Sequence, residues 1–174
     1  MGLSILSSKK LVVVLFVFAA AVVPALSQVF IIDGKVVSID GGDSITVVNR
    51  RKIRHRVRLA GIAAPAPSQE FNQEATKYLS GMILGKTVKI VGRRFDDNGL
   101  LKGKVLLDGR DMNLEQVVAG FAWHHEDFPA EQSARDRQLY EAAEAHARKL
   151  KFNLWSGTNP TPPWLFREGR SAVR

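Results

Sequence analysis

The feature that most constrains the fold is a series of short segments rich in Val and Ile, separated by turn signals. Residues 29–39 and 44–48 have this composition, and a Gly- and Asp-rich stretch at 40–43 lies between them. Arginines then alternate with less polar residues from 54 to 59. A period of two is typical of half-buried β-strands, and Gly- and Asp-rich stretches are typical of turns. The first half of the chain is therefore predicted to be built from strands.

The second feature is a set of helical segments that interrupt and follow the strands. They are expected at residues 68–84, 113–120 and 130–151. Ser68 is a suitable N-cap, and Gly85 is a suitable C′ residue because glycine adopts a positive φ without steric cost. Asn113 followed by Gln116 indicates a capping box. The last segment is dominated by Ala, Glu, Arg and Lys, all of which favour helix.

Further strands are expected at 86–91 and 100–107, which brings the number to five. Five short strands with inserted and appended helices predict an α+β fold, a small Greek-key barrel of the OB type. An α+β sandwich would give a similar pattern. We expect residues 28–156 to form one domain and the Pro- and Gly-rich residues 157–174 to form an extended tail.

The N-terminus has the composition of an export signal. Two lysines precede an apolar run at residues 11–23, and a proline and small residues follow it at 24–27. This order is typical of a secretory signal peptide, and the run is short for a membrane span, which needs about 20 residues. We expect residues 1–27 to be removed and the mature protein, beginning near Gln28, to be periplasmic or secreted. An uncleaved membrane anchor is the alternative.

Composition narrows the classes of partner. The chain holds no cysteine, which excludes disulfides and thiol chemistry. It holds 25 Lys and Arg against 17 Asp and Glu, and removal of the two lysines of the leader leaves an excess of six positive charges. A basic excess favours polyanions such as nucleic acid, an anionic polysaccharide or a membrane surface, without choosing among them. A solvated basic surface without a ligand is the alternative.

Four motifs occur in a consistent order between residues 35 and 156. They are I-D-G-G-D-S-I at 39–45, R-L-A-G-I-A-A-P-A at 58–66, D-G followed by V-A-G-F-A at 108–122, and E-A-H-A-R-K-L-K-F-N-L-W-S at 144–156. Together they make the chain similar to the staphylococcal-nuclease-like, or thermonuclease, family. The resemblance implies a five-stranded OB-fold barrel of the staphylococcal nuclease type with about three helices.

The resemblance also implies a chemistry, the metal-assisted hydrolysis of phosphodiesters. In this family one Ca²⁺ is held by two carboxylates and a backbone carbonyl, and it collects the charge that develops on the phosphate. A glutamate acts as general base on the attacking water, and two arginines clamp the phosphate oxygens.

The residues of this chain match part of that site. Asp43 falls at the first metal carboxylate and Arg58 at the first arginine. The second metal carboxylate falls at Ala63, the general base at Ala66 and the second arginine at Leu100. Loss of a positioned base alone typically costs about a hundred- to ten-thousandfold in rate, and a Ca²⁺ site with one carboxylate is weak. We therefore expect an exported protein of this family with a mostly lost catalytic site and no cofactor.

Binding is the function expected to remain. Arg54, Arg56 and Arg58 should project from one face of one strand, because side chains alternate along a strand. They are the candidate ligand-binding residues together with Trp123, since the corresponding loop of the resembled family helps to hold the nucleotide by stacking. Core packing is the alternative role of Trp123. We expect a monomer that weakly binds single-stranded nucleic acid or an anionic polysaccharide.

Two other functions stay open. One is an active metal-dependent nuclease with a displaced site, for which Ca²⁺ would be the cofactor. The residues that could replace its missing groups are Glu70 as base, Asp40 at the metal, and Lys102 or Lys104 for the second arginine. Each has a simpler role as a solvated or turn-forming residue. The other function is that of an accessory protein, because the chain resembles small exported nuclease-like proteins encoded among succinoglycan, or exopolysaccharide, biosynthesis genes.

Overall fold

The computed structural model describes residues 29–95, 100–125, 132–167 and 169 of the chain. The expected signal peptide at 1–27 and the first two residues of the helix expected at 130–151 lie outside the described residues. The elements in chain order are β1 (Phe30–Gly41), β2 (Ser44–Asn49), β3 (Arg54–Leu59), β4 (Ile62–Ala63), α1 (Asn72–Ile83), β5 (Thr87–Phe95), β6 (Leu101–Leu107), β7 (Arg110–Asp111), α2 (Met112–Val118), β8 (Trp123–His124), α3 (Ala134–Lys149), η2 (Asn153–Ser156) and α4 (Pro163–Arg167). No helix within these residues is long and apolar enough to cross a membrane.

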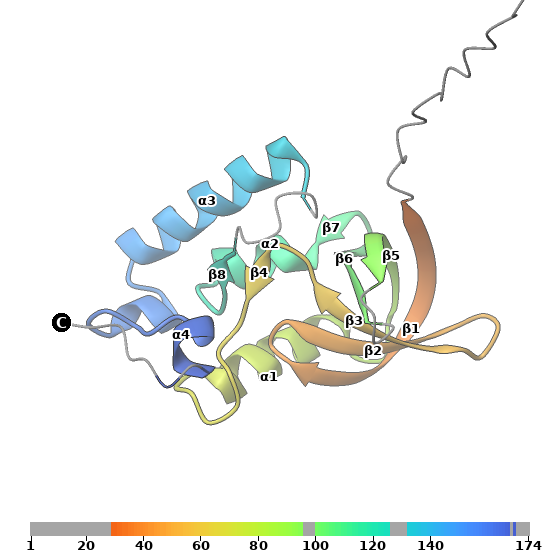
Figure 1. Ribbon diagram of the computed structural model, residues 1–174, viewed down its shortest axis with the longest axis horizontal. Coiled ribbons are helices and arrows are strands. Elements are labelled where there is room, and N and C mark those ends of the chain that lie inside the picture. The colour runs from red at the N-terminus through yellow and green to blue at the C-terminus, as the bar shows by residue number, and fades with distance from the viewer. Residues whose placement is uncertain (1–28, 96–99, 126–131, 168, 170–174) are drawn as a thin grey trace, which may run out of the picture.

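A barrel closes because β3 and β6, at opposite ends of a run of five strands, also pair with each other. The main sheet has the order β3-β2-β1-β5-β6-β7, and its successive neighbours are antiparallel. The closing pair is parallel and joins Val57–Leu59 to Leu101–Gly103. Figure 1 shows the barrel on one side of the molecule and α3 and α4 on the other. The five-stranded OB-type barrel predicted from the sequence is confirmed, with β7 as an additional short strand.

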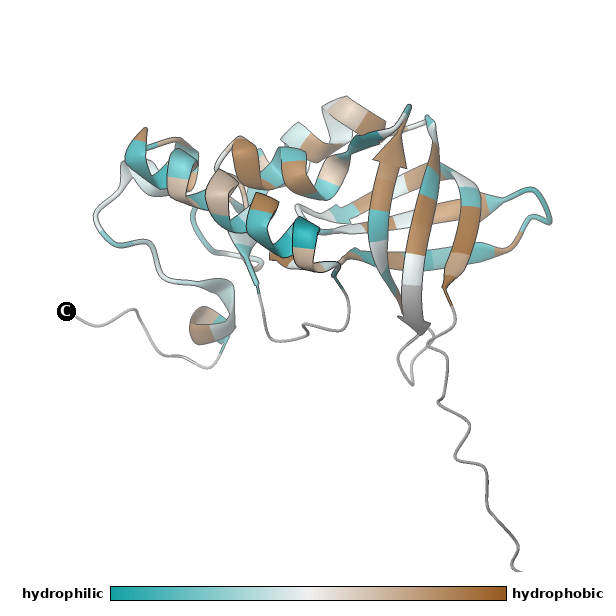
Figure 2. Ribbon diagram, turned by 90° about the horizontal axis from the view of Figure 1, so that it is seen from above, coloured by the Kyte–Doolittle hydropathy of each residue, from teal (hydrophilic) through white to brown (hydrophobic). Residues whose placement is uncertain are grey.

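The barrel interior is filled by apolar residues that alternate along its strands. The buried side chains are Val36, Ile45, Val47, Val57, Leu59, Val88, Ile90, Leu101 and Val105. Figure 2 shows hydrophobic and hydrophilic residues alternating along the strands. Full burial of one such side chain contributes about 1.5–3 kcal/mol. The alternation that predicts the strands therefore also supplies the stabilisation that closes the barrel.

Helix α1 begins later than predicted. Ser68 and Phe71 have φ angles of 68° and 62°, so the backbone passes through left-handed conformations before the helix starts at Asn72. Ser68 is therefore not the N-cap. That position belongs to Phe71, whose side chain makes no capping hydrogen bond. The predicted end is confirmed, because Gly85 follows the C-cap residue with a φ of 77°.

The capping box predicted at Asn113 and Gln116 is wrong. Asp111 is the N-cap of α2, and its carboxylate accepts hydrogen bonds from the backbone N–H groups of Asn113 and the next residue. Asn113 is instead buried in the core. Its Oδ1 accepts from Val105 N at 3.0 Å, and its Nδ2 donates to Ala60 O at 2.9 Å. This amide ties α2 to β6 and to the end of β3.

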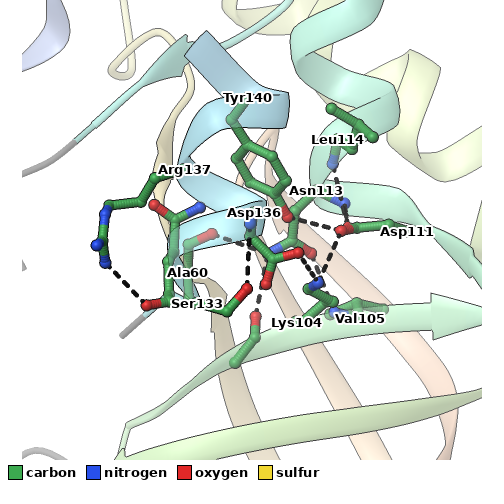
Figure 3. A network of polar contacts seen from close by, with 12 residues as sticks. Ala60, Lys104, Val105, Asp111, Asn113, Leu114, Ser133, Asp136, Arg137 and Tyr140 are labelled. Carbon is green, nitrogen blue, oxygen red and sulfur yellow. Dashed lines mark hydrogen bonds and ion pairs between the residues drawn. The ribbon is translucent and has the colours of Figure 1, made fainter. Parts of the chain in front are cut away.

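A polar network holds α3 against the barrel (Figure 3). Tyr140 donates its hydroxyl to Asp111 Oδ2 at 2.8 Å. Lys104 Nζ lies 2.5 Å from Asp136 Oδ1 and 3.4 Å from Asp111 Oδ2. Burial and the neighbouring Asp111 carboxylate raise the pKa of Tyr140, so its hydroxyl keeps its proton and remains a donor. The network therefore joins α2, α3 and β6 through charge-assisted hydrogen bonds.

Stability should decline in acid through Asp136, in the first turn of α3. This helix begins at Ala134 after the N-cap Ser133, later than the predicted residue 130. Burial raises the pKa of Asp136, but hydrogen bonds with Lys104 and Ser133 outweigh it and hold the pKa below its usual value. Such a carboxyl adds stability above its unfolded pKa, and this stability is lost as pH falls through the folded pKa.

Lys104→Met should therefore lower the free energy of unfolding at pH 7 and flatten its decline below about pH 4, where Asp136 takes up its proton. Urea unfolding at a series of pH values measures both effects. A variant that loses stability in acid as steeply as the parent would show that this ion pair does not carry the dependence.

The sequence predicts an extended tail at 157–174. The structure differs there, because residues from Pro163 form the short helix α4. Proline is favoured at the first helical position, where its missing N–H leaves no bond unmade. Trp164 of α4 packs edge-on against Trp123, with 6.5 Å between ring centroids, and stacks on His125 at 4.5 Å. These aromatic contacts attach the tail to the rest of the domain.

Candidate functional site

Three segments meet where the motifs predict a site. They are the turn between β1 and β2, the end of β3, and the chain that leaves β4. Leu59 N donates to Asp43 O at 2.9 Å, which holds the turn against β3. The ladder pairs Ser44 with Arg58, so Asp43 lies next to Arg58 in space. The barrel thus brings the two matching residues of the predicted site together.

The carboxylate of Asp43 is surrounded by protein donors. Its Oδ2 accepts from Arg58 Nη2 at 2.9 Å and from Ala64 N at 3.0 Å. Its Oδ1 accepts from Ser44 Oγ at 2.8 Å. Asp43 is 6% exposed, whereas the side chain of Arg58 is 30% exposed. A buried carboxylate needs such partners, because an unpaired charge in the interior is strongly destabilising. Asp43 therefore links three segments of the fold.

The residues that the resemblance predicts at the remaining site positions, Ala63, Ala66 and Leu100, have side chains without oxygen or charge. Ala63 and Ala66 are 2% and 3% exposed. Ala63 pairs with β8 through its backbone, and Ala66 N donates to Gln69 Oε1 at 2.9 Å. Leu100, the predicted position of the second arginine, directly precedes β6. Among the residues that the structure describes, no three His, Asp or Glu side chains are grouped to hold a metal ion.

The turn before Asp43 depends on residues whose role was not predicted. Gln116 is completely buried, and its Nε2 donates to Gly42 O at 2.5 Å and to Ala75 O at 3.1 Å. A Cβ atom at Gly42 would lie 2.7 Å from the Cβ atoms of both Ala64 and Ala75. The close packing explains why the first motif has glycine here. A polar residue on the buried side of a short helix is the signal that identifies Gln116.

The four residues considered as replacements lie in different surroundings. Lys102 is in register with Arg58 across the closing pair of strands, so both project to the same side. Lys104 is engaged in the network that holds α3. Asp40 accepts hydrogen bonds from nearby hydroxyl groups and not from the neighbours of Asp43. Glu70 is exposed in the turn before α1, not in its first turn. Of the four, Lys102 lies beside Arg58.

The candidate ligand-binding residues divide into two groups. Arg54 and Arg56 are exposed on the outward face of β3, and Arg58 continues this face with partial burial, because the residues between them point inward. Trp123 is 2% exposed and packs edge-on against Trp155 at 5.4 Å between ring centroids. The arginines therefore form a cationic face, whereas the position of Trp123 fits the core-packing alternative.

Comparison with known proteins identifies the family. Residues 56–157 match the model of the family described as staphylococcal nuclease homologue. An uncharacterized endonuclease of Escherichia coli is 33% identical over 160 residues, which cover 91% of this chain and 97% of the relative. A micrococcal nuclease of Shigella flexneri is 33% identical over 144 residues, which cover 77% of this chain and 79% of the relative. With its barrel and its four motifs in order, the chain belongs to the staphylococcal nuclease family.

Proposed function

We propose that this protein is exported and binds nucleic acid through the cationic face of β3 without hydrolysing it efficiently. The observation that carries the proposal is the Asp43 carboxylate, whose two oxygens accept hydrogen bonds from Arg58, Ala64 and Ser44. Relatives named as nucleases support nucleic acid as the ligand. The apolar run at residues 11–23 supports export.

The residues at the site do not fit the Ca²⁺ of the family. Ca²⁺ takes about six to eight oxygen ligands, with carboxylates prominent among them. Asp43 supplies one carboxylate, and Ala63 supplies no side-chain oxygen. A cation placed at Asp43 Oδ2 would also meet the positive guanidinium of Arg58, whose Nη2 is 2.9 Å from that oxygen. The ion pair with Arg58 thus occupies the position that a metal would require.

The groups that would accept a proton from water and stabilise the charge on the phosphate are missing as well. Ala66 cannot take a proton from water, and Leu100 cannot stabilise a phosphate oxygen. A positioned base is worth about 10²–10⁴ in rate, and one charge-stabilising donor about 10²–10³. The attraction of cationic side chains for a phosphate backbone does not depend on either group. Binding is therefore expected to persist where hydrolysis does not.

A second candidate is a nuclease with a displaced site. It is favoured by Lys102, whose register beside Arg58 places two cationic side chains on one side of the closing strands. Two neighbouring cations can contact one phosphate and offset its charge. This candidate still requires a base and a metal ligand from residues other than Ala66 and Ala63.

A cleavage assay separates the two candidates. Mature protein from the exported fraction, whose N-terminus near Gln28 checks the export part of the proposal, is incubated with labelled single- and double-stranded DNA in Ca²⁺ or EDTA. We expect the same background in both, and no Ca²⁺ binding by calorimetry, because the metal ligands are incomplete. Cleavage that requires Ca²⁺ and disappears in Asp43→Ala would contradict the proposal and favour the nuclease.

A further inference from the structure

The β2–β3 hairpin carries a run of positive charge that begins at Arg50 and ends at Arg58. Six of the nine residues from 50 to 58 are Arg or Lys, and no Asp or Glu occurs between Asp43 and Glu70. The turn of this hairpin projects beyond the barrel, and its tip is hydrophilic (Figures 1 and 2). Residues 49–58 are called the basic arm. Its density of charge sets it apart from the scattered basic residues of the helices.

Apart from Arg58, which pairs with Asp43, the charges of the basic arm are exposed, and Asp33 of β1, which lines the same hollows as Arg50 and Lys52, forms no ion pair with these described residues. Arg50, Arg51, Lys52, Arg54 and Arg56 are all exposed. Within the described part of the chain, none of these five side chains forms an ion pair. Like charges held this close repel one another, which opposes folding, and a bound polyanion relieves the repulsion. The arm therefore has the electrostatic character of a binding surface.

The shape of the basic arm is set by uncharged groups. Asn49 Oδ1 accepts from Arg51 N at 2.9 Å and from Ile53 N at 3.0 Å, and Asn49 Nδ2 lies 3.0 Å from His55 Nε2. The charged side chains take no part in these bonds, so the turn presents them in a preformed arrangement. Preformed contacts lose less conformational entropy on binding.

We propose that the basic arm extends the nucleic-acid contact beyond the cationic face of β3: its turn residues Arg50, Arg51 and Lys52 bind the phosphate backbone and continue that face; this inference rests on the proposed function. Five of its six cations are arginines, whose planar fork pairs with phosphate oxygens in a bidentate manner. Outward side chains two residues apart on a strand repeat at about 6.6 Å. Arg54, Arg56 and Arg58 can therefore meet successive charges of an extended backbone.

The contact is to the backbone and not to the bases. The arm contains no Phe, Tyr or Trp on which a base could stack. Its binding should accordingly be independent of sequence and governed by counterion release.

The family match begins at residue 56, so the four cations from Arg50 to Arg54 precede the matched residues. Most of the arm thus lies just before the region matched by the family model.

The test measures how salt weakens binding. Fluorescence anisotropy follows a labelled single-stranded oligonucleotide, its duplex and a heparin oligosaccharide from low to high salt. The arm variant combines Arg50→Gln, Arg51→Gln and Lys52→Gln, and its matched control combines Lys77→Gln, Lys86→Gln and Lys149→Gln, all at exposed positions. For single strands each lost phosphate contact reduces the salt slope by about 0.7. We expect the arm variant to lower the slope by about 2 and the control to leave it unchanged.

The outcomes distinguish this inference from the proposed function. If the parent binds and the arm variant has the same salt slope, the arm does not contact the phosphate backbone. That result would contradict this inference but not the proposed function. Absence of binding by the parent at low salt would overturn both. Arm-dependent binding of heparin without binding of either oligonucleotide would overturn the assignment to phosphate. A second variant, Arg54→Gln with Arg56→Gln, should lower the slope by about 1.4 if the ligand follows β3.

Discussion

Asp43→Ala is expected to strengthen the binding of a single-stranded oligonucleotide while it weakens the fold. The change releases the partly exposed Arg58 from its ion pair and so strengthens its contact with phosphate, by up to one full contact. One contact changes the single-strand salt slope by about 0.7, which corresponds to about fivefold in affinity at 0.1 M salt. Anisotropy titration measures the gain. In a nuclease that uses Asp43 for its metal, the same change would instead abolish Ca²⁺-dependent cleavage.

The expected loss of stability follows from the same contacts. Asp43→Ala removes the acceptor of Arg58 Nη2, Ala64 N and Ser44 Oγ. Breaking a fully buried ion pair costs about 3–5 kcal/mol, and the partial exposure of Arg58 reduces this to about 2 kcal/mol. Urea unfolding measures the change.

Two controls show whether Arg58 is responsible for the gain in affinity. Asp40→Ala removes the same charge near the end of β1, where the Asp40 carboxylate accepts from Ser38 and Thr46 in exposed hydrogen bonds. It should leave affinity and stability nearly unchanged. Arg58→Ala should weaken binding more than Lys149→Ala, which lies at the end of α3. Equal gains for Asp43→Ala and Asp40→Ala would attribute the effect to net charge alone.

Asn113→Ala is expected to have the largest effect on stability. Its amide joins Val105 N on β6 to Ala60 O after β3, and it also donates to Gly103 O at 3.2 Å. The residue has no exposed surface, so water cannot replace the lost partners without entering the core. A buried backbone group that loses its partner costs about 1–3 kcal/mol. We therefore expect a loss of about 3 kcal/mol in the free energy of unfolding.

The measurement for Asn113→Ala is urea unfolding at pH 7, with Ser38→Ala as control. Ser38 donates to Asp40 at an exposed position, so its replacement should change stability by less than about 0.5 kcal/mol. A loss below 1 kcal/mol in Asn113→Ala would show that its three bonds are redundant. Retention of stability in Asn113→Asp would point the same way, because the carboxylate cannot donate to Ala60 O.

Local patterns predicted the strands and the end of α1, and the resemblance carried by the four motifs favoured the barrel over an α+β sandwich. Alternation of apolar residues specifies which face of each strand is buried, and Gly85 marks a helix end because its preference for positive φ is intrinsic to glycine. The motifs also placed Asp43 and Arg58 at one site, which the ladder between β2 and β3 brings about. These features depend on the residue itself or on near neighbours, and so they can be recognised in the sequence.

Features that depend on distant contacts required the tertiary structure. Asn113 and Gln116 have the side chains of a capping box, but burial directs them to partners as far away as Gly42. The three hydrogen bonds on Asp43 include one from Ala64 N, a residue in another segment. The resemblance predicts that Ala63 and Ala66 replace carboxylates, but it does not predict that the carboxylate of Asp43 is paired with Arg58. Which donors surround a buried carboxylate is decided by how the barrel packs, because each partner is supplied by a different strand or turn.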